Sequence, residues 1–409
     1  MRDAQRAGLP VRSITPLGSL RRFAPAVGDV SLLAVAPADA HHDVLTGFAR
    51  LTAAVILARS PTHLIIGNDR GTVSVHVAVP EEAGSALVWH TGSRTHTSAL
   101  QMRAQRLGLT FDRARLLDRQ GQPLASDTEA DFYRHLELPE IPPELREDGN
   151  EIVVAERGEL PPLVSTSDIR GDLHMHSTWS DGRDSIEQMA FASQQLGYEY
   201  IAITDHSERS LASRQLAATD ISRQGADIQR ARARVKRVQI LHGVEVDIMH
   251  DGSLDFDDEQ LAGFDIVLAS LHDHAGHDAS KLTERYLRAI RHPLVNVITH
   301  PANRTPGRSS GYPLDFDALF AAAAETGTAM EVDGAPGHLD LDGALARRAV
   351  AAGVTLVIDS DCHRSDGLGR QMRFGVGTAR RGWIGPEHVL NTRGLDEVRA
   401  FVARKRARR

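Results

Sequence analysis

Residues 171–182 read GDLHMHSTWSDG, with two histidines one residue apart at the end of a short apolar run and an aspartate followed by glycine soon after. Side chains alternate across a β-strand, so His174 and His176 project to one face and can chelate a single ion. Such a pair also has an ordinary structural explanation, because histidine is often a hydrogen-bonded residue at a strand end. The rest of the same region decides between the two interpretations.

From Arg170 onward, apolar β-branched runs with polar tips alternate with segments of helical spacing. The runs are GDLHMH (171–176), YEYIAITDH (198–206), VQILHGVEVD (238–247), FDIVLASLHD (264–273), VNVITHP (295–301), TAMEVDGAP (328–336) and TLVIDSDCH (355–363). This alternation is typical of parallel strands joined by crossover helices. The fold class is therefore α/β, and seven such strands predict a barrel.

Titratable side chains recur at the tips of these runs. They are His206, Glu245, His272, His300, Asp361 and His363, and Asp181 follows the first run. Because the C-terminal ends of parallel strands converge on one face of a barrel, we expect these side chains to join His174 and His176. Nitrogen and oxygen donors in such number exceed the needs of one tetrahedral ion, and they indicate two or three divalent ions of Zn, Mn or Fe. Clustered cations activate water and orient a phosphate, so the expected chemistry is phosphoester hydrolysis.

The bulk composition excludes several classes of protein. The chain has 409 residues, 41% hydrophobic and 25% charged, which is the profile of a globular protein of two or three domains. A net charge of -7 argues against a surface that coats nucleic acid throughout. The single cysteine, Cys362, excludes an internal disulfide and thiolate zinc sites. No apolar run approaches the roughly 20 residues of a membrane helix, and the start lacks a signal-peptide core, so we expect a cytoplasmic protein without membrane partners.

A family resemblance follows from the motifs DLHMHSTWSDG, AITDHS, GVEVDI, SLHDH, THPANR and DSDCH. Over residues 170–403 they resemble the polymerase and histidinol phosphatase (PHP) domain. The segments EIPPELRED (140–148), DIRGDLHMHSTWSDG (168–182) and MRFGVGTARRGW (372–383) further resemble the PHP region of bacterial family X DNA polymerases (PolX). The resemblance implies a distorted (β/α)₇ barrel that acts as a metal-dependent phosphoesterase.

The resemblance also implies how the ligands divide among the ions. His174, His176, Glu245 and Asp361 would hold one ion, Glu245, His272 and His300 a second, and Asp181, His206 and His363 a third. We expect Glu245, Asp361 and His363 to take part in catalysis together with Arg304 of THPANR. The Arg304 guanidinium can bind a phosphate oxygen, and the alternative for it is a surface salt bridge.

The region before the barrel resembles a truncated, degenerate PolX palm (residues 1–82) and thumb (residues 83–138), a smaller α+β part. We expect residues 139–169 to form a linker and residues 404–409 a basic, solvated tail. Gly18 and Ser19 of GSLRR match the phosphate-binding start of the palm. The family then needs three carboxylates, because two-metal nucleotidyl transfer requires acids to hold both ions.

The carboxylate set of this palm is incomplete, since Asp29 is present but Ser31 and Ser74 stand at the other two positions. A neutral hydroxyl cannot replace a carboxylate in charge balance, so we expect polymerase activity to be lost. The segment WHTGSRTHT (89–97) also has Trp89, His90 and Thr97 where the family usually shows Tyr, Phe and Asn. A degenerate nucleotide pocket is the consequence.

Four functions are compatible with these patterns. The leading expectation is a 3′–5′ exonuclease or another enzyme that processes DNA 3′ ends. The first alternative is a phosphatase of small phosphate monoesters, since the barrel motifs serve both chemistries equally well. A noncatalytic DNA-repair scaffold and residual gap-filling synthesis are the others. The complete ligand set argues against the scaffold, and the serines argue against synthesis.

Overall fold

The computed structural model describes residues 8–51, 55–69 and 71–407. The chain divides into two compact units, Met1–Leu160 and Pro161–Arg409, and each is described by itself. Among the described residues, no helix is long and apolar enough to cross a membrane.

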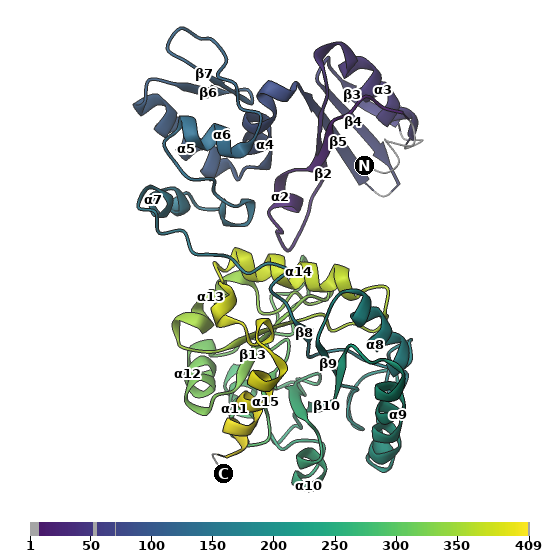
Figure 1. The fold of residues 1–409 in the computed structure, drawn as a ribbon. Helices are drawn as coiled ribbons and strands as arrows, with labels where there is room; N and C mark the ends of the chain where they lie inside the picture. Colours follow the sequence, from purple (N-terminus) through teal and green to yellow (C-terminus); the bar gives the residue numbers. More distant parts are fainter. Residues whose placement is uncertain (1–7, 52–54, 70, 408–409) are drawn as a thin grey trace. The chain divides into compact units, whose positions relative to one another are not determined.

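The first unit is built on a five-stranded sheet in the order β1-β2-β5-β4-β3 (Figure 1). Its strands are β1 (Ser13–Pro16), β2 (Val30–Val35), β3 (Val55–Arg59), β4 (His63–Asn68) and β5 (Gly71–Ala78). β2 and β5 run parallel, and the other neighbours run antiparallel. Val44 and Leu45 of helix α3 (His41–Leu51) pack against Leu64 and Val75 of the sheet, so the helix covers one apolar face.

The remainder of this unit is mainly helical. Its elements are α2 (Gly18–Arg21), α4 (Ala83–Thr91), α5 (Arg94–Arg106), β6 (Thr110–Asp112), β7 (Arg115–Leu117), α6 (Glu129–His135) and α7 (Asn150–Glu156), with short 3₁₀ turns at 38–40, 80–82 and 143–145. Much of the expected linker is folded here, because Ile141, Leu145 and Ile152 are buried within the first unit. The prolines of this stretch therefore shape a packed segment and do not mark a free connection.

The second unit is a nearly closed barrel of seven parallel strands, in the order β14-β13-β12-β11-β10-β9-β8. The strands are β8 (Gly171–Asp172), β9 (Tyr200–Ile203), β10 (Gln239–Asp247), β11 (Ile266–Ser270), β12 (Val297–Ile298), β13 (Ala329–Asp333) and β14 (Leu356–Asp359). Just beyond β8 and β14, Met175 and Cys362 form a parallel bridge that brings the first and last strands together. The predicted α/β barrel is confirmed.

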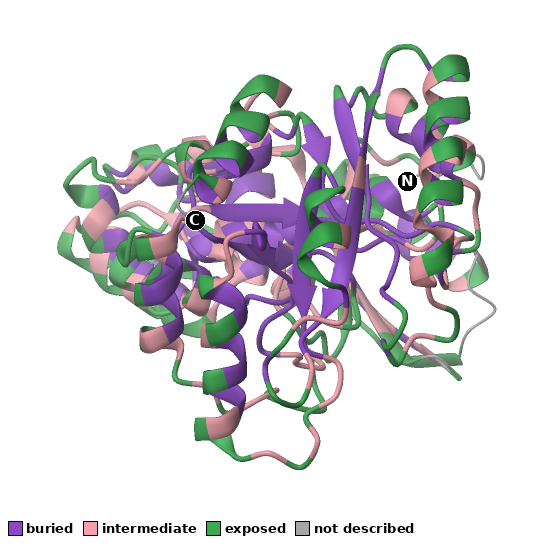
Figure 2. Cartoon of the chain, turned by 90° about the horizontal axis from the view of Figure 1, so that it is seen from below, coloured by how far each residue is buried: buried purple, intermediate pink, exposed green. Residues whose placement is uncertain are grey.

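Helices surround this barrel between successive strands. They are α8 (Ile186–Gln195), α9 (Ile221–Arg234), α10 (Asp258–Ala262), α11 (Ala279–Arg291), α12 (Phe316–Thr326), α13 (Gly343–Ala351), α14 (Leu368–Arg381) and α15 (Leu395–Arg406), with 3₁₀ turns at 218–220, 386–388 and 390–392. In Figure 2 most of the barrel's strand residues are buried, whereas the helices bury one side and expose the other. This explains why the strand sequences read as continuous apolar runs, as strands covered on both faces do.

Alternate residues of the strands contribute to two different cores. In β9, Ile201 and Ile203 face the surrounding helices, whereas Tyr200 and Ala202 join a core completed by Val398, Phe401 and Val402 of α15. Tyr200 opens β9, and its hydroxyl donates to the Arg393 carbonyl at 2.9 Å, so the C-terminal helix closes the amino end of the barrel. The carboxyl end is left for polar side chains.

The expected basic tail is partly folded. α15 continues to Arg406, and Lys405 is buried, donating from Nζ to the Ile290 carbonyl and to Thr328 Oγ1, both at 2.6 Å. The prediction of a solvated tail is thus wrong for this residue, because its long apolar stem and ammonium suit a buried site with oxygen acceptors. Residues 408 and 409 of that tail lie outside the described residues.

Candidate metal centre

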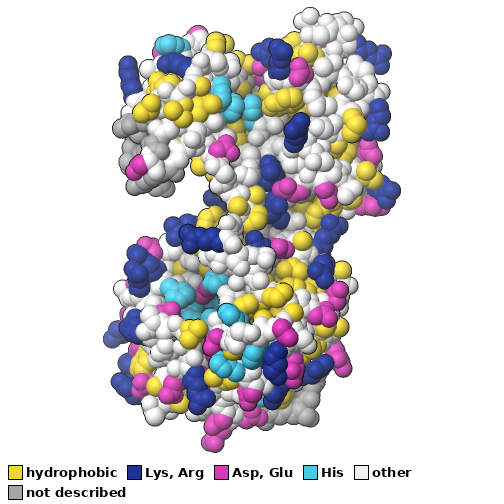
Figure 3. Space-filling model, turned by 180° about the vertical axis from the view of Figure 1, so that it is seen from behind, with side chains coloured by type: hydrophobic (Ala, Val, Ile, Leu, Met, Phe, Trp, Pro, Cys, Tyr) yellow, Lys and Arg dark blue, Asp and Glu magenta, His cyan; other side chains and the backbone are white. Residues whose placement is uncertain are grey.

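Strand ends position the expected ligands. His174 and His176 follow β8, His206 follows β9, Glu245 lies in β10, His272 follows β11, His300 follows β12, and Asp361 and His363 follow β14. Asp181 lies in the turn region between β8 and α8. The structure brings all of these side chains, which come from nearly two hundred positions of sequence, into overlapping groups of potential ligands. Figure 3 shows histidine side chains gathered on one face of the barrel unit.

The deepest group contains His174, His176 and Asp361, all of them buried. Asp361 Oδ1 lies 3.1 Å from His176 Nε2 and 3.5 Å from His174 Nε2. The two Nε2 atoms lie 3.1 Å apart, so both imidazoles point at the same place. One ion could accept all three donors.

Glu245 connects this group to a second one. Its Oε1 lies 3.0 Å from His300 Nε2 and 3.6 Å from His272 Nε2. Its Oε2 lies 3.4 Å from His174 Nε2 and 2.9 Å from His206 Nδ1. The two oxygens of one buried carboxylate therefore face different sets of imidazoles, which is the geometry of a bridging ligand.

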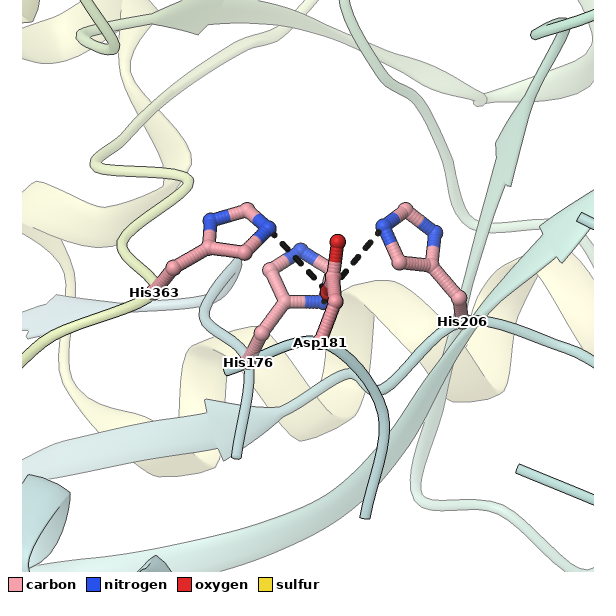
Figure 4. A group of neighbouring side chains, drawn as sticks. All are labelled: His176, Asp181, His206 and His363. Atoms are coloured by element: carbon pink, nitrogen blue, oxygen red, sulfur yellow. Dashed lines mark ion pairs between the residues drawn. The ribbon is translucent and has the colours of Figure 1, made fainter. Parts of the chain in front are cut away.

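The third group is formed by His176, Asp181, His206 and His363 (Figure 4). Asp181 Oδ1 lies at its centre, 3.2 Å from His363 Nε2 and 3.7 Å from His206 Nε2. His176 joins with its second ring nitrogen, Nδ1, at 3.9 Å from the same oxygen, so one imidazole borders two groups. This group lies nearer to solvent, since the His363 side chain is 34% exposed and that of His174 is 0% exposed.

Two carboxylates of the strands contact the ring nitrogens of these histidines that face away from Glu245. This role was not predicted from the sequence. Glu331 of β13 lies with Oε1 2.7 Å from His174 Nδ1, and its Oε2 accepts the His300 amide at 2.8 Å. Asp247 of β10 lies with Oδ1 3.1 Å from His272 Nδ1. Such partners orient imidazoles toward an ion and raise their basicity. The sequence could have indicated Asp247, because it follows Glu245 by two residues and so lies on the same face of the strand.

Neighbouring charges, together with burial, determine the protonation states of the expected metal ligands. Burial favours the neutral acid at Glu245, yet His206 and His174 hold its pKa well below the usual value. Burial also opposes charging of His300, but its hydrogen bond to Glu245 raises the pKa to about 9. At His176, burial together with His363 and His206 lowers the pKa to about 3, so this imidazole is neutral and has one ring-nitrogen lone pair to donate. The carboxylates are thus ionised, as metal ligands must be.

The donor set fits divalent cations. It comprises imidazoles and carboxylates without a thiolate, the set typical of Zn²⁺, Mn²⁺ and Fe sites. The ring nitrogen His176 Nδ1, which faces the group around Asp181, is buried without a hydrogen-bond partner among the described residues. Buried polar atoms rarely lack a partner, so the arrangement is one that a bound ion would complete.

Arg304 adopts the alternative expected for it, a salt bridge. Its Nη1 donates to Asp342 Oδ2 at 2.9 Å, and Asp342 Oδ1 caps the amino end of α13 through the Leu345 amide. Arg304 also lines a surface cavity of about 410 Å³ together with Arg308 and Ser309. A phosphate contact by Arg304 remains a prediction, and it requires exchange of the Asp342 carboxylate for the phosphate.

The palm-like residues also lie where the sequence places them relative to each other. Ser31 and Ser74 are direct partners on the parallel strands β2 and β5. Ser31 Oγ donates to Asp29 Oδ2 at 2.8 Å, so a hydroxyl occupies the space beside the remaining acid. Gly18 and Ser19 begin the short helix α2. The prediction that Ser31 and Ser74 replace two carboxylates of the polymerase pattern stays a prediction, and their neighbouring positions agree with it.

Comparison with known proteins agrees with this geometry. Residues 172–301 match the family model of the PHP domain, and residues 86–147 match that of the DNA polymerase beta thumb. A parallel barrel with these ligand groups at its carboxyl end, matched by that model, defines a phosphoester hydrolase of the PHP class.

Two kinds of known proteins are similar to this chain in sequence. The chain is 36% identical over 391 residues to the DNA polymerase/3′-5′ exonuclease PolX of Bacillus subtilis, covering 95% of this chain and 68% of that protein. It is 28% identical over 247 residues to a probable phosphatase of Thermoanaerobacter, and 31% identical over 208 residues to one of Shewanella oneidensis; these cover 58% and 48% of the chain. The chain belongs to the PolX family of family X DNA polymerases that carry a PHP domain.

Proposed function

We propose that the barrel is a metal-dependent 3′–5′ exonuclease or 3′-end processing enzyme that acts on DNA. The observation that carries the proposal is the position of Glu245, whose two carboxylate oxygens border two groups of donors. A carboxylate shared in this way would hold two cations close together, and pairs about 3.5–4 Å apart clamp the attacking and leaving oxygens of a phosphoryl displacement.

Two or three ions of Zn, Mn or Fe are proposed for the site. His174, His176, Glu245 and Asp361 would hold one, and Glu245 would share it with His272 and His300. Asp181, His206 and His363 would hold a third. Bound divalent cations supply Lewis-acid activation of water and neutralise charge on the phosphoryl oxygens.

The exposure of the ligands indicates the side from which substrate enters. Asp181, His272 and His363 are partly exposed, whereas His174 and Glu245 are fully buried. A phosphodiester therefore meets the group around Asp181 and His363 first. Glu245, Asp361 and His363 hold the reacting phosphate in place through the cations, and Arg304 is available to a phosphate oxygen once it leaves Asp342.

DNA is preferred as substrate because the polymerase-like part is retained beside a complete hydrolase site. The Bacillus subtilis relative, which aligns along 95% of this chain, is named as a 3′-5′ exonuclease. A phosphatase of small monoesters is the second candidate, because the probable phosphatases align with the barrel part of the chain. Polymerase activity is proposed to be lost, since Ser31 and Ser74 replace carboxylates.

One experiment separates the two substrates. The protein is incubated with Mn²⁺ and a 5′-labelled single strand, and in parallel with p-nitrophenyl phosphate. Shortening of the strand from its 3′ end, abolished by His174→Ala, supports the DNA proposal. An intact strand alongside turnover of the monoester overturns it and supports the second candidate.

A further inference from the structure

A further set of metal-type donors lies beside the centre, formed by Asp333, His338 and Asp361. Asp333 is the last residue of β13, and His338 lies in the loop before α13. One donor atom of each lies within 4.8 Å of those of the other two. Neither Asp333 nor His338 belongs to the ligand set that the motifs imply.

Two of these side chains hold buried atoms that nothing satisfies. Asp333 is fully buried, and its Oδ1 accepts the Ala335 amide at 2.5 Å, whereas its Oδ2 has no hydrogen-bond partner among the described residues. His338 Nδ1 is likewise buried and without a partner there. A buried polar atom without a partner costs about 1–3 kcal/mol, so unsatisfied atoms on two members of one donor group favour a bound ligand at this group.

The chemistry of the trio fits a cation. Asp333 and Asp361 lie together in a buried place, where two ionised carboxylates would repel each other strongly. Without a cation the pair therefore keeps a proton, and burial together with Asp361 holds the pKa of Asp333 well above its usual value. A divalent cation removes the repulsion and takes the imidazole nitrogen as a third ligand.

The position of His338 is fixed by its neighbour. Its ring stacks on that of His300, with centroids 5.0 Å apart and planes inclined by 22°. His300 is in turn held to Glu245 at 3.0 Å. The imidazole of His338 is therefore oriented by packing before any ion binds, as ligands of a built site are.

We propose that Asp333, His338 and Asp361 form a further binding position for a divalent transition-metal ion such as Mn²⁺ or Zn²⁺. It shares Asp361 with the group of His174 and His176. The ligands are two carboxylates and one imidazole, with the remaining positions open to water or substrate. The proposal goes beyond the function proposed above and does not depend on which phosphoester the enzyme cleaves.

Metal stoichiometry tests the proposal without any substrate. The full-length protein is stripped with a chelator and dialysed against a series of free Mn²⁺ concentrations, and bound metal is measured by elemental analysis. We expect Asp333→Asn and His338→Ala each to bind one ion fewer than the wild type at saturation. Asn keeps the shape of Asp333 and the acceptor for Ala335, so this variant changes charge with little change in packing.

The matched control is His250→Ala, because His250 forms an exposed pair with Asp273 at 2.7 Å and belongs to none of the ligand groups. It should bind as much metal as the wild type. Wild-type stoichiometry and affinity in both Asp333→Asn and His338→Ala overturn the proposal. Loss of all ions in both variants also overturns it, because the residues would then support the centre as a whole.

A crystal grown with Mn²⁺ gives a direct second readout that does not rely on a variant. We expect an anomalous peak about 2.2 Å from Asp333 Oδ2 and from His338 Nδ1. A water molecule in that place, with anomalous peaks at the other groups, contradicts the proposal and leaves the proposed function untouched.

Discussion

Ser31 of β2 and Ser74 of β5 face each other across a parallel strand pair, and the Ser31 hydroxyl donates to Asp29. We expect these residues to mark the place of a polymerase site that needs three carboxylates and has one. The barrel, by contrast, brings its expected donors into overlapping groups. The two units therefore differ in the charges that cation binding needs.

Nucleotide incorporation should be absent in the wild-type protein. One acid cannot hold the two cations that nucleotidyl transfer uses, so a primed template with Mn²⁺ and all four deoxynucleotides should show no extension. His174→Ala serves as background, because it removes the competing degradation of the primer. Extension that disappears in Asp29→Ala would prove the expectation wrong.

Glu245→Gln should reduce phosphoester hydrolysis more than about 100-fold. Changes of residues that only hydrogen-bond to a metal ligand cost about 10–100-fold, and Glu245 itself lies within 4 Å of five imidazoles. The measurement is kcat with p-nitrophenyl phosphate or labelled DNA, together with the metal content of the purified protein. Full activity with an unchanged number of ions would contradict the bridging role.

Glu331→Gln should weaken metal binding by about 10–100-fold without removing a ligand. The amide cannot supply the negative charge that orients His174, although it can still accept the His300 amide. Isothermal titration with Zn²⁺ of the stripped protein measures the change. Glu284→Gln, on the exposed side of α11, is the matched control and should titrate as the wild type does.

Without bound metal, the stability of the protein should decrease as the pH becomes alkaline. Burial opposes the charging of His300 and His363, but hydrogen bonds to Glu245 and Asp181 raise the pKa of each to about 9, above the usual 6.5. Because the folded state keeps these protons longer, their contribution to stability is complete below pH 6.5 and is lost as the pH rises through about 9. The Tm of the chelator-treated protein should therefore fall over this range.

The metal-loaded protein is the control for this pH dependence. Its imidazoles have already given up their protons to the ions, so its Tm should not follow the same slope. Differential scanning calorimetry at several pH values, with and without EDTA, measures both curves. Parallel curves would show that these histidines do not titrate as inferred.

Lys405→Ala should lower the free energy of unfolding by about 1–3 kcal/mol, because it removes the buried ammonium that donates to both the Ile290 carbonyl and the Thr328 hydroxyl and leaves only the bond between these two groups. Urea denaturation measures the loss. Lys281→Ala, which removes an exposed lysine paired with Glu284, should change stability by less than about 1 kcal/mol. Equal effects of the two changes would argue against the buried contacts.

The barrel and the ligand groups were predictable because both depend on local patterns. The alternation of apolar runs with helical segments identified the strands. The convergence of strand ends then predicted that His174 and Glu245 lie close together. The contact between Glu331 and His174 was not predictable in this way. It depends on which strands are neighbours and on how deeply each side chain is buried, and the residue spacing within a single strand reveals neither.

Other features were missed because they rest on distant partners. A salt bridge was one expectation for Arg304, but its partner Asp342 belongs to a different loop and could not be named from the sequence. The burial of Ile141 and Lys405 depends on surfaces supplied by other segments. Prolines around Ile141 indicated irregular backbone, but composition does not reveal whether irregular backbone is packed, nor that Lys405 lies in a helix.

Asn391 ties the two ends of the barrel sheet, since its side-chain amide donates to the Gly171 carbonyl at 2.8 Å and to the Ile358 carbonyl at 2.6 Å. Contacts between residues so far apart in the chain cannot form until most of the second unit has been synthesised. Folding of a domain with many such distant pairings is slow. During translation, therefore, the contacts that Asn391 makes with both ends of the sheet can form only after the segment that follows β14 has left the ribosome.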